Sequence, residues 1–283
     1  MPTQEEVTQS VLGAVRDFLG GPISDGDAWC FDFGEHLESN WGAVYGGAVA
    51  AAVLSVARCA TPERSPRSMH VQMTRSLPRG AARALTEVRH AGRTIATVEV
   101  DLYDAREKLC AIALVTMVTP EAVAAQYHDT TATPFAVTTA PFEIPPRLAP
   151  MQKPLKMLRE VDGVFHRAYD ETLRRSVDGT IPPIGTLTVP WERIDVTGPE
   201  VACLAADAMV APPVINSFVP AEALGPNPDL SLRFTTAPAT RVVQTSGTLL
   251  SVQHGTASIG LEVQTDDQLL AHGLATSLLP LRS

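Results

Sequence analysis

The segment NWGAVYGGAVAAAVLSVARCA, residues 40–60, decides the fold, because only Ser55 and Arg58 interrupt its apolar run after Val44. A helix with this composition has no face suited to water, so other elements must surround it. The run is also Ala-rich and Gly-rich, and it is shorter than the roughly 20 apolar residues that a membrane span needs. We therefore expect a buried helix and no membrane insertion.

Composition narrows the class of protein. The chain has 283 residues, of which 45% are hydrophobic, enough for one large domain or two modest ones and too many for a disordered chain. A net charge of -9 argues against binding to nucleic acid, which depends on neutralising phosphates. The N-terminal 20 residues begin with acidic side chains and have apolar residues at helical spacing, as in an amphipathic helix and unlike a signal peptide. We therefore expect a cytoplasmic protein.

The four cysteines are scattered and have mostly apolar neighbours. None lies in a CxxC pair, so the pattern favours buried, reduced thiols over a metal site, and no cofactor is implied. They are Cys30, Cys59, Cys110 and Cys203.

A strand meander follows the apolar helix, and the same plan recurs later in the chain. The segment RTIATVEVDLYD, residues 93–104, alternates between polar and apolar side chains and lies between two further strand-like segments, ARALTEVRH and KLCAIALVTMV. Three similar segments, SGTLLSVQH, TASIGLEVQT and QLLAHGLATSLL, occupy the C-terminal part. Setting Gly92 against Gly255 aligns Glu99-Val100 with Glu262-Val263, which indicates an internal duplication.

The duplication gives the domain organisation. We expect a first copy over residues 1–119, a linker rich in Pro, Thr and Ala over 120–154, and a second copy over 155–283. A twisted antiparallel sheet long enough to curl round the apolar helix would supply the surroundings which that helix needs. The pair Gly46-Gly47 costs roughly 1 kcal/mol per Gly in helix propensity, so either another group approaches the backbone closely there or the helix packs tightly on the sheet.

Two sets of motifs resemble the double hotdog acyl-CoA thioesterases, the acyl-CoA thioesterase II family. VYGGAVAAAVLSVA, RSMHVQMTRSLPRG and the three following strands are similar to its first half. PWERID, LAADAMVAPPVIN, NPDLSLRFTTAP and DQLLAHGLATSLL are similar to its second half. The resemblance implies an α+β double hotdog, in which each copy wraps an antiparallel sheet round a central helix, and an acyl-CoA substrate.

The resemblance also implies site residues. The family has an Asp near the start of the second central helix, a Thr or Ser on the following strand segment, and a Gln on the last strand. The matching positions hold Asp207, Asn227 and either Ala275 or its neighbour Thr276, so the Gln is absent. Asp207 would activate water and Asn227 would orient it. Simpler roles are a helix N-cap for Asp207 and a turn residue for Asn227.

Further residues are candidates for substrate binding. Backbone N–H groups at a helix start can stabilise an oxyanion, and the resemblance places Gly46 and Gly47 there. Residues 58–93 also hold a cluster of arginines that suits the phosphates of coenzyme A, with Arg75 and Arg79 as candidate ligands. The alternative is a solvated strand face on which the arginines pair across strands. The cluster comprises Arg58, Arg64, Arg67, Arg75, Arg79, Arg83, Arg89 and Arg93.

The leading hypothesis is therefore an acyl-CoA thioesterase that releases a free acid and CoA. A second is a double hotdog that binds acyl thioesters or lipids without turnover, or that pairs with another protein, and the absent Gln is its main support. A double hotdog hydratase ranks last, because no His stands five residues after Asp207. The partner we expect is acyl-CoA, with a homodimer plausible.

Overall fold

One antiparallel sheet runs through both copies of the repeated unit. The computed structural model describes residues 16–39, 42–126, 184–190, 198–211, 213–214, 225–235, 242–265 and 268–279. The first copy contains β1 (Ile23–Asp25), β2 (Ala28–Phe33), a 3-10 turn (Glu35–Leu37), α2 (Gly46–Ala60), β3 (Ser65–Met73), β4 (Gly80–Ala91), β5 (Ile95–Asp104), β6 (Leu109–Val118) and the short α3 (Pro120–Ala124). The second contains β7 (Ile184–Pro190), α4 (Gly198–Asp207), β8 (Asp229–Phe234), β9 (Val242–Gln253), β10 (Thr256–Thr265) and β11 (Gln268–Leu278).

The strand order shows the duplication directly. Among the described residues, the sheet runs β1-β2-β4-β5-β6-β3-β8-β11-β10-β9-β7. Read inward from each edge, β2-β4-β5-β6-β3 and β7-β9-β10-β11-β8 follow the same plan, and the copies join where β3 pairs with β8, with His70 opposite Ser231. The predicted repeat of a helix and an antiparallel meander is therefore confirmed.

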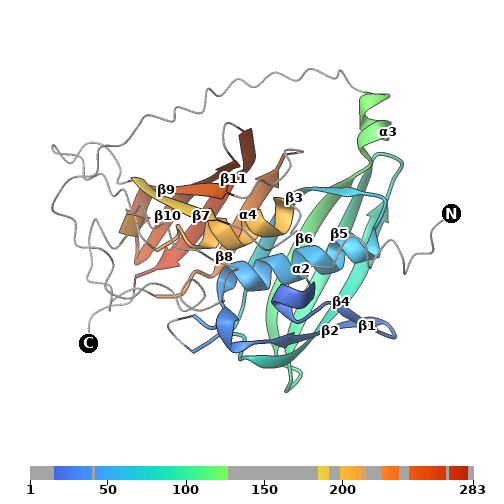
Figure 1. Ribbon diagram of the computed structural model, residues 1–283, viewed down its shortest axis with the longest axis horizontal. Coiled ribbons are helices and arrows are strands. Elements are labelled where there is room, and N and C mark those ends of the chain that lie inside the picture. The colour runs from blue at the N-terminus through green and yellow to red at the C-terminus, as the bar shows by residue number, and fades with distance from the viewer. Residues whose placement is uncertain are drawn as a thin grey trace.

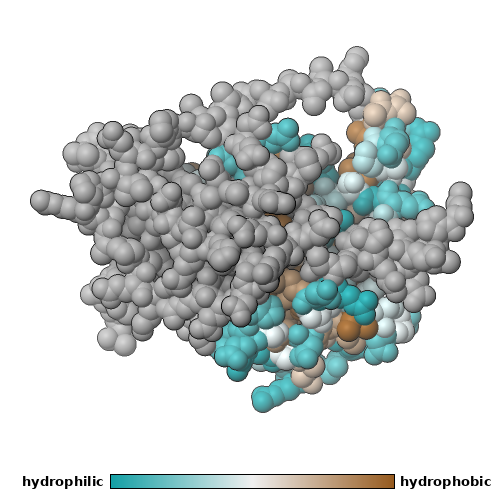
Figure 2. All heavy atoms as spheres, in the orientation of Figure 1, coloured by the Kyte–Doolittle hydropathy of each residue, from teal (hydrophilic) through white to brown (hydrophobic). Residues whose placement is uncertain are grey.

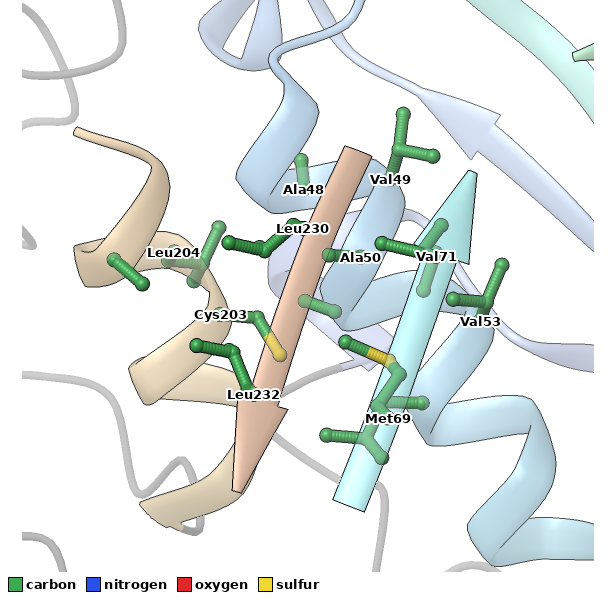
Figure 3. Packing of buried hydrophobic residues seen from close by; sticks show 14 of the residues in the cluster. Ala48, Val49, Ala50, Val53, Met69, Val71, Cys203, Leu204, Leu230 and Leu232 are labelled. Atoms are coloured by element: carbon green, nitrogen blue, oxygen red, sulfur yellow. The ribbon is translucent and has the colours of Figure 1, made fainter. Parts of the chain in front are cut away.

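The two helices lie next to each other on the same side of this sheet (Figure 1). Every residue of α2 from Gly47 to Ala57 is buried, so the absence of a polar face has its structural reason. Strand β3 contacts α2 and strand β8 contacts α4, and their inward side chains fill the space between the sheet and the helices (Figure 3). Burying each large apolar side chain contributes about 1.5–3 kcal/mol. The labelled residues in this layer include Val49, Val53, Met69, Val71, Leu204, Leu230 and Leu232.

Strand alternation is predicted well where one face is wet. In β5, Val98, Val100 and Leu102 are buried, as the sequence predicts. Strands β2 and β3 are not predicted. The reason in β3 is its Pro66 and its polar outward residues, which include His70 and Gln72 and weaken the hydrophobic signal of a strand that is nevertheless central.

Parts of the predicted organisation lie outside the described residues. The predicted N-terminal helix is described only from residue 16, and Phe18, its last apolar position, is buried. The predicted linker begins with α3, and the rest of it after residue 126 is not described. The copy boundaries therefore stay a prediction. None of the described helices is long and apolar enough to cross a membrane.

The described surface over β1, β2 and β4 is mostly hydrophilic, with scattered apolar atoms (Figure 2). Exposed ion pairs contribute to this polar character in the first copy. Arg83 contacts Glu107 at 2.8 Å, and Arg89 contacts both Glu87 and Glu99. Arg83 and Arg89 therefore follow the alternative of pairing on a solvated face.

One ion pair is buried between the two helices. Arg58, in the last turn of α2, contacts Glu200, in the first turn of α4, at 2.5 Å. The Glu200 side chain has no exposed area and that of Arg58 is 13% exposed. Each charge also lies at the helix end whose dipole favours it.

We expect Arg58→Met to destabilise the protein by about 3–5 kcal/mol, because it leaves the Glu200 carboxylate buried without a counter-charge. The double variant Arg58→Met/Glu200→Leu should recover much of this loss. Urea unfolding followed by circular dichroism measures both. Arg83→Met, at an exposed pair, is the control and should cost no more than about 1 kcal/mol. Equal losses at the two sites would show that burial of the pair is not decisive.

Candidate functional site

The end of one helix meets the beginning of the other at a buried carboxylate. Asp207 is the last residue of α4, and Gly47 is the second residue of α2. The Gly47 backbone N–H donates a hydrogen bond of 2.8 Å to Asp207 Oδ2. Asp207 is buried, and the bond joins the two copies of the repeat.

The location of Asp207 corrects one prediction. The resemblance implied a position near the start of the second central helix, whereas Asp207 is the last residue of α4. Asp207 is therefore not the N-cap of its own helix. It caps α2 instead, since the N-cap residue of that helix, Tyr45, makes no side-chain cap hydrogen bond.

The glycine pair allows this approach. A Cβ at Gly47 would lie 2.6 Å from Tyr45 Cε1 and 2.8 Å from the Cys203 carbonyl oxygen. A Cβ at Gly46 would lie 3.0 Å and 3.1 Å from the two carboxylate oxygens of Asp207. The expected close approach to the backbone is therefore confirmed, and the element that approaches is helix α4 rather than the sheet.

Asn227 reaches the same carboxylate from a loop. Its Nδ2 donates to Asp207 Oδ1, so its side chain does more than shape a turn. The loop lies between the two copies, because the Met73 N–H at the end of β3 donates to the Pro228 carbonyl at 2.7 Å. The loop is also held by β11, because the Leu278 N–H donates to the Pro226 carbonyl at 3.1 Å.

The surroundings of Asp207 change its acidity. Burial raises the pKa of its carboxyl group from 3.8 to about 6, while hydrogen bonds from Gly47, Asn227 and Tyr45 act in the opposite direction. A carboxylate whose pKa lies near neutrality can accept a proton and release it again under ordinary conditions. The Asp207 carboxyl group can therefore exchange a proton near neutral pH.

The two positions matched to the family Gln, Ala275 and Thr276, lie on opposite faces of β11. Ala275 is buried and pairs with Leu230 and Ile259, which are also buried, so it faces the core. The Thr276 side chain lies on the opposite face of β11 from Ala275. Its backbone N–H donates a hydrogen bond to Asp229 Oδ1. Of the two positions matched to the family Gln, Ala275 therefore faces the core and Thr276 does not.

The two candidate arginines differ in availability. Arg79 Nη1 lies 3.8 Å from Glu35 and 3.5 Å from Glu38. Arg75 is exposed and makes no ion pair within the described part of the chain. It follows Met73 by two residues, and the Met73 Cε atom is 3.2 Å from the position of a Cβ on Gly46. Arg75 therefore lies near the site along the sequence. Unlike Arg79, it has no carboxylate within ion-pair distance among the described residues.

The described residues do not favour thiol or metal chemistry. Among them, no three His, Cys, Asp or Glu side chains are placed to hold a metal ion. Burial raises the pKa of the Cys59 thiol to about 12 and that of Cys203 well above its ordinary value, so both are unreactive as nucleophiles. Cys59, Cys110 and Cys203 are buried free thiols, and Cys30 is a half-buried one.

Tyr45 is a site residue that the sequence analysis missed. Its hydroxyl donates a 2.9 Å hydrogen bond to the Leu204 carbonyl of α4, and its side chain is buried. A buried Tyr hydroxyl requires a polar partner. A tyrosine directly before the glycine pair at the start of a buried helix was the signal available in the sequence.

Comparison with known proteins identifies the type of fold and domain. Residues 37–118 match the family model of the acyl-CoA thioesterase N-terminal domain. The resemblance to the double hotdog acyl-CoA thioesterases is confirmed. No curated protein matches the sequence.

Solved structures match the double hotdog over nearly its whole length. The TesB protein of Mycobacterium avium subsp. paratuberculosis is 17% identical, with a TM-score of 0.67 over 95% of this chain and 100% of that one. Acyl-CoA thioesterase II TesB2 of Mycobacterium marinum is 14% identical, with a TM-score of 0.67 over 95% and 98%. A protein of unknown function with a hot dog fold from Alicyclobacillus acidocaldarius is 17% identical, with a TM-score of 0.69 over 95% and 99%. At these identities the similarity establishes the fold.

The raised pKa of Asp207 predicts a pH-dependent stability. The unfolded chain loses this proton near pH 3.8 and the folded chain near pH 6, so the folded state binds more protons in between and stability falls as pH rises through this window. The contribution is about 3 kcal/mol for a shift of about two units. Asp207→Asn removes it.

Urea unfolding at about pH 3 and about pH 7.5, either side of that window, measures this effect. We expect the free energy of unfolding to fall more in the parent protein than in Asp207→Asn. Asp32→Asn, at an exposed carboxylate, is the control and should behave like the parent. Identical pH dependence in the parent and Asp207→Asn would mean that the carboxyl group is not perturbed.

Proposed function

We propose that this double hotdog hydrolyses acyl-CoA thioesters and that Asp207 is the general base. The observation that supports this most directly is the buried Asp207 carboxylate, held by the Gly47 N–H and the Asn227 amide where the two copies meet. The match of residues 37–118 to an acyl-CoA thioesterase domain supports the reaction class.

The proposed reaction follows from the donors and acceptors present. Asp207 takes a proton from a water molecule, and the water oxygen attacks the thioester carbonyl carbon. The tetrahedral intermediate then collapses, the carbon–sulfur bond breaks, and the proton passes to the CoA sulfur. The products are the free acid and CoA. Asn227 orients the water through its amide, which can both donate and accept.

The oxyanion role falls on Gly46 rather than Gly47. The Gly47 N–H already donates to Asp207. Gly46 is the first residue of α2 and is half-buried, and no hydrogen bond from its N–H is made to the described part of the chain. An unengaged N–H at a helix start favours developing negative charge. A Cβ on Gly46 would lie 3.0 Å from the nearer carboxylate oxygen of Asp207, so Gly46 and the general base lie close together.

A binding protein without turnover is the second candidate. Ala275 favours it, because a methyl group in place of a Gln can neither orient water nor donate to an oxyanion. The ionisable, hydrogen-bonded Asp207 favours the enzyme, since a site that only binds an apolar acyl chain gains nothing from a buried carboxylate. A homodimer and a cytoplasmic location stay predictions.

Thiol release from short, medium and long acyl-CoAs tests the function. We expect turnover in the parent and a loss of at least about 100-fold in Asp207→Asn, the scale of a missing general base. Asp32→Asn serves as the control for changed charge. Measurable acyl-CoA binding without turnover in the parent would select the binding protein instead.

Arg75 is the proposed contact to the phosphates of CoA. We expect Arg75→Ala to raise KM for acyl-CoA about three- to tenfold, because an exposed charge–phosphate contact is worth around 1 kcal/mol. Arg79→Ala should have less effect, because Glu35 and Glu38 already neutralise that guanidinium. An acyl N-acetylcysteamine thioester, which has no phosphate, should be hydrolysed equally by all three proteins. An increase in KM for this substrate in Arg75→Ala would contradict a phosphate contact.

A further inference from the structure

Ser277 is a buried serine on the last strand, and its hydroxyl makes no hydrogen bond to the described part of the chain. It is 2% exposed and lies on β11 opposite Ala257 of β10. Ala257 is buried in the core, and directly opposed residues share a face of a sheet, so the Ser277 side chain points toward the helices. A buried hydroxyl without a partner is costly, so its presence here requires an explanation.

Both neighbours of Ser277 on β11 are bonded to the segment of residues 225–229, which contains Asn227. The Thr276 N–H donates to a carboxylate oxygen of that segment at 3.1 Å. Leu278 donates to the segment through its N–H at 3.1 Å and accepts from it through its carbonyl at 2.9 Å. Ser277 is therefore held beside Asn227 by contacts on both sides.

Asn227 connects this end of β11 to the buried carboxylate, because its Nδ2 donates to Asp207 Oδ1. On the opposite side of the same loop, the Met73 N–H at the end of β3 donates to the carbonyl of the residue after Asn227 at 2.7 Å. The Met73 Cε atom lies 3.2 Å from the position of a Cβ on Gly46, where the carboxylate is also close. Met73 thus borders the site from β3, and Ser277 is the inward-facing residue that borders it from β11.

We propose that Ser277 is a further catalytic residue, whose hydroxyl holds the water molecule that Asp207 activates. This inference rests on the proposed function. A water molecule has two O–H groups, of which one donates to Asp207 and loses its proton there, while the other donates to Ser277 Oγ. A lone pair of the water oxygen then remains to attack the thioester carbonyl carbon. Ser277 keeps its own proton throughout.

Ser277 supplies a polar group that the preceding inward position of β11 lacks. That position is Ala275, whose methyl group cannot bind water. Ser277 lies two residues further along the strand, at the end where β11 contacts the Asn227 loop. The absence of a Gln at Ala275 is therefore compatible with turnover.

The test is Ser277→Ala, which removes the hydroxyl and adds no atoms to the core. We expect kcat for acyl-CoA to fall about tenfold, the effect of one lost hydrogen bond, with KM changed by no more than about twofold. The urea midpoint of unfolding should stay the same or rise, because the hydroxyl has no partner in the protein to lose. A lower midpoint would indicate a structural hydroxyl and overturn the proposal, as would an unchanged kcat.

Ser55→Ala is the matched control. Ser55 is also a buried serine, but its hydroxyl donates to the Ala52 carbonyl at 2.8 Å within α2. It lies nine residues after Gly46 in that helix, a distance of about 13.5 Å along the axis. We therefore expect Ser55→Ala to lower the urea midpoint and to leave kcat unchanged, the reverse of Ser277→Ala. An equal fall of kcat in both variants would contradict a specific role for Ser277.

High-resolution crystal structures of the parent and of Ser277→Ala separate this inference from the proposed function. We expect the parent to hold an ordered water within hydrogen-bond distance of both Ser277 Oγ and an Asp207 carboxylate oxygen, and the variant to lack it. A parent structure without this water would overturn the proposal. If the parent holds the water but hydrolyses no acyl-CoA, the proposed function fails while the water site at Ser277 stands.

Discussion

Reciprocal capping between α2 and α4 is the interaction on which the site depends. Asp207, at the end of α4, accepts from the Gly47 N–H at the start of α2. Tyr45, at the N-cap of α2, donates to the Leu204 carbonyl in the last turn of α4. Each helix thus satisfies terminal backbone groups of the other, groups that would otherwise be buried without partners. Because the caps cross between copies, neither copy alone contains the site.

The same arrangement makes Asp207 costly to ionise. The carboxylate is buried and lies at the end of α4 where the helix dipole disfavours negative charge. Its compensation comes from the start of α2, whose dipole has the opposite sense, and from Asn227 on a loop held between β3 and β11. A carboxylate that is expensive to charge but not forced to stay neutral suits proton transfer, and proteins keep such groups at functional sites despite their cost in stability.

The elements that the sequence predicts are those with a strong local signal. The Ala-rich run after Val44 predicts α2, and the alternation over residues 93–104 predicts β5, because both patterns reflect burial along one element. The location of Asp207 at the end of α4, the crossing bond from Gly47 and the contribution of Tyr45 depend on pairing between elements about 160 residues apart. No local pattern encodes such pairing. The glycine pair did show that a close neighbour exists, without showing which element it is.

The opposite ends of the two helices show why duplication has not produced two equal sites. There, α2 ends and α4 begins, so the same crossing caps could form in principle. Matching the first residues of the helices, Gly46 and Gly198, sets Pro199 against Gly47 and Ser55 against Asp207. Proline has no N–H to donate, and the Ser55 hydroxyl donates to Ala52 within its own helix. The Arg58–Glu200 pair joins the helices at that end instead. One end of the helix pair is therefore closed by a buried salt bridge, and the other is held by hydrogen bonds to a carboxylate that can still exchange its proton.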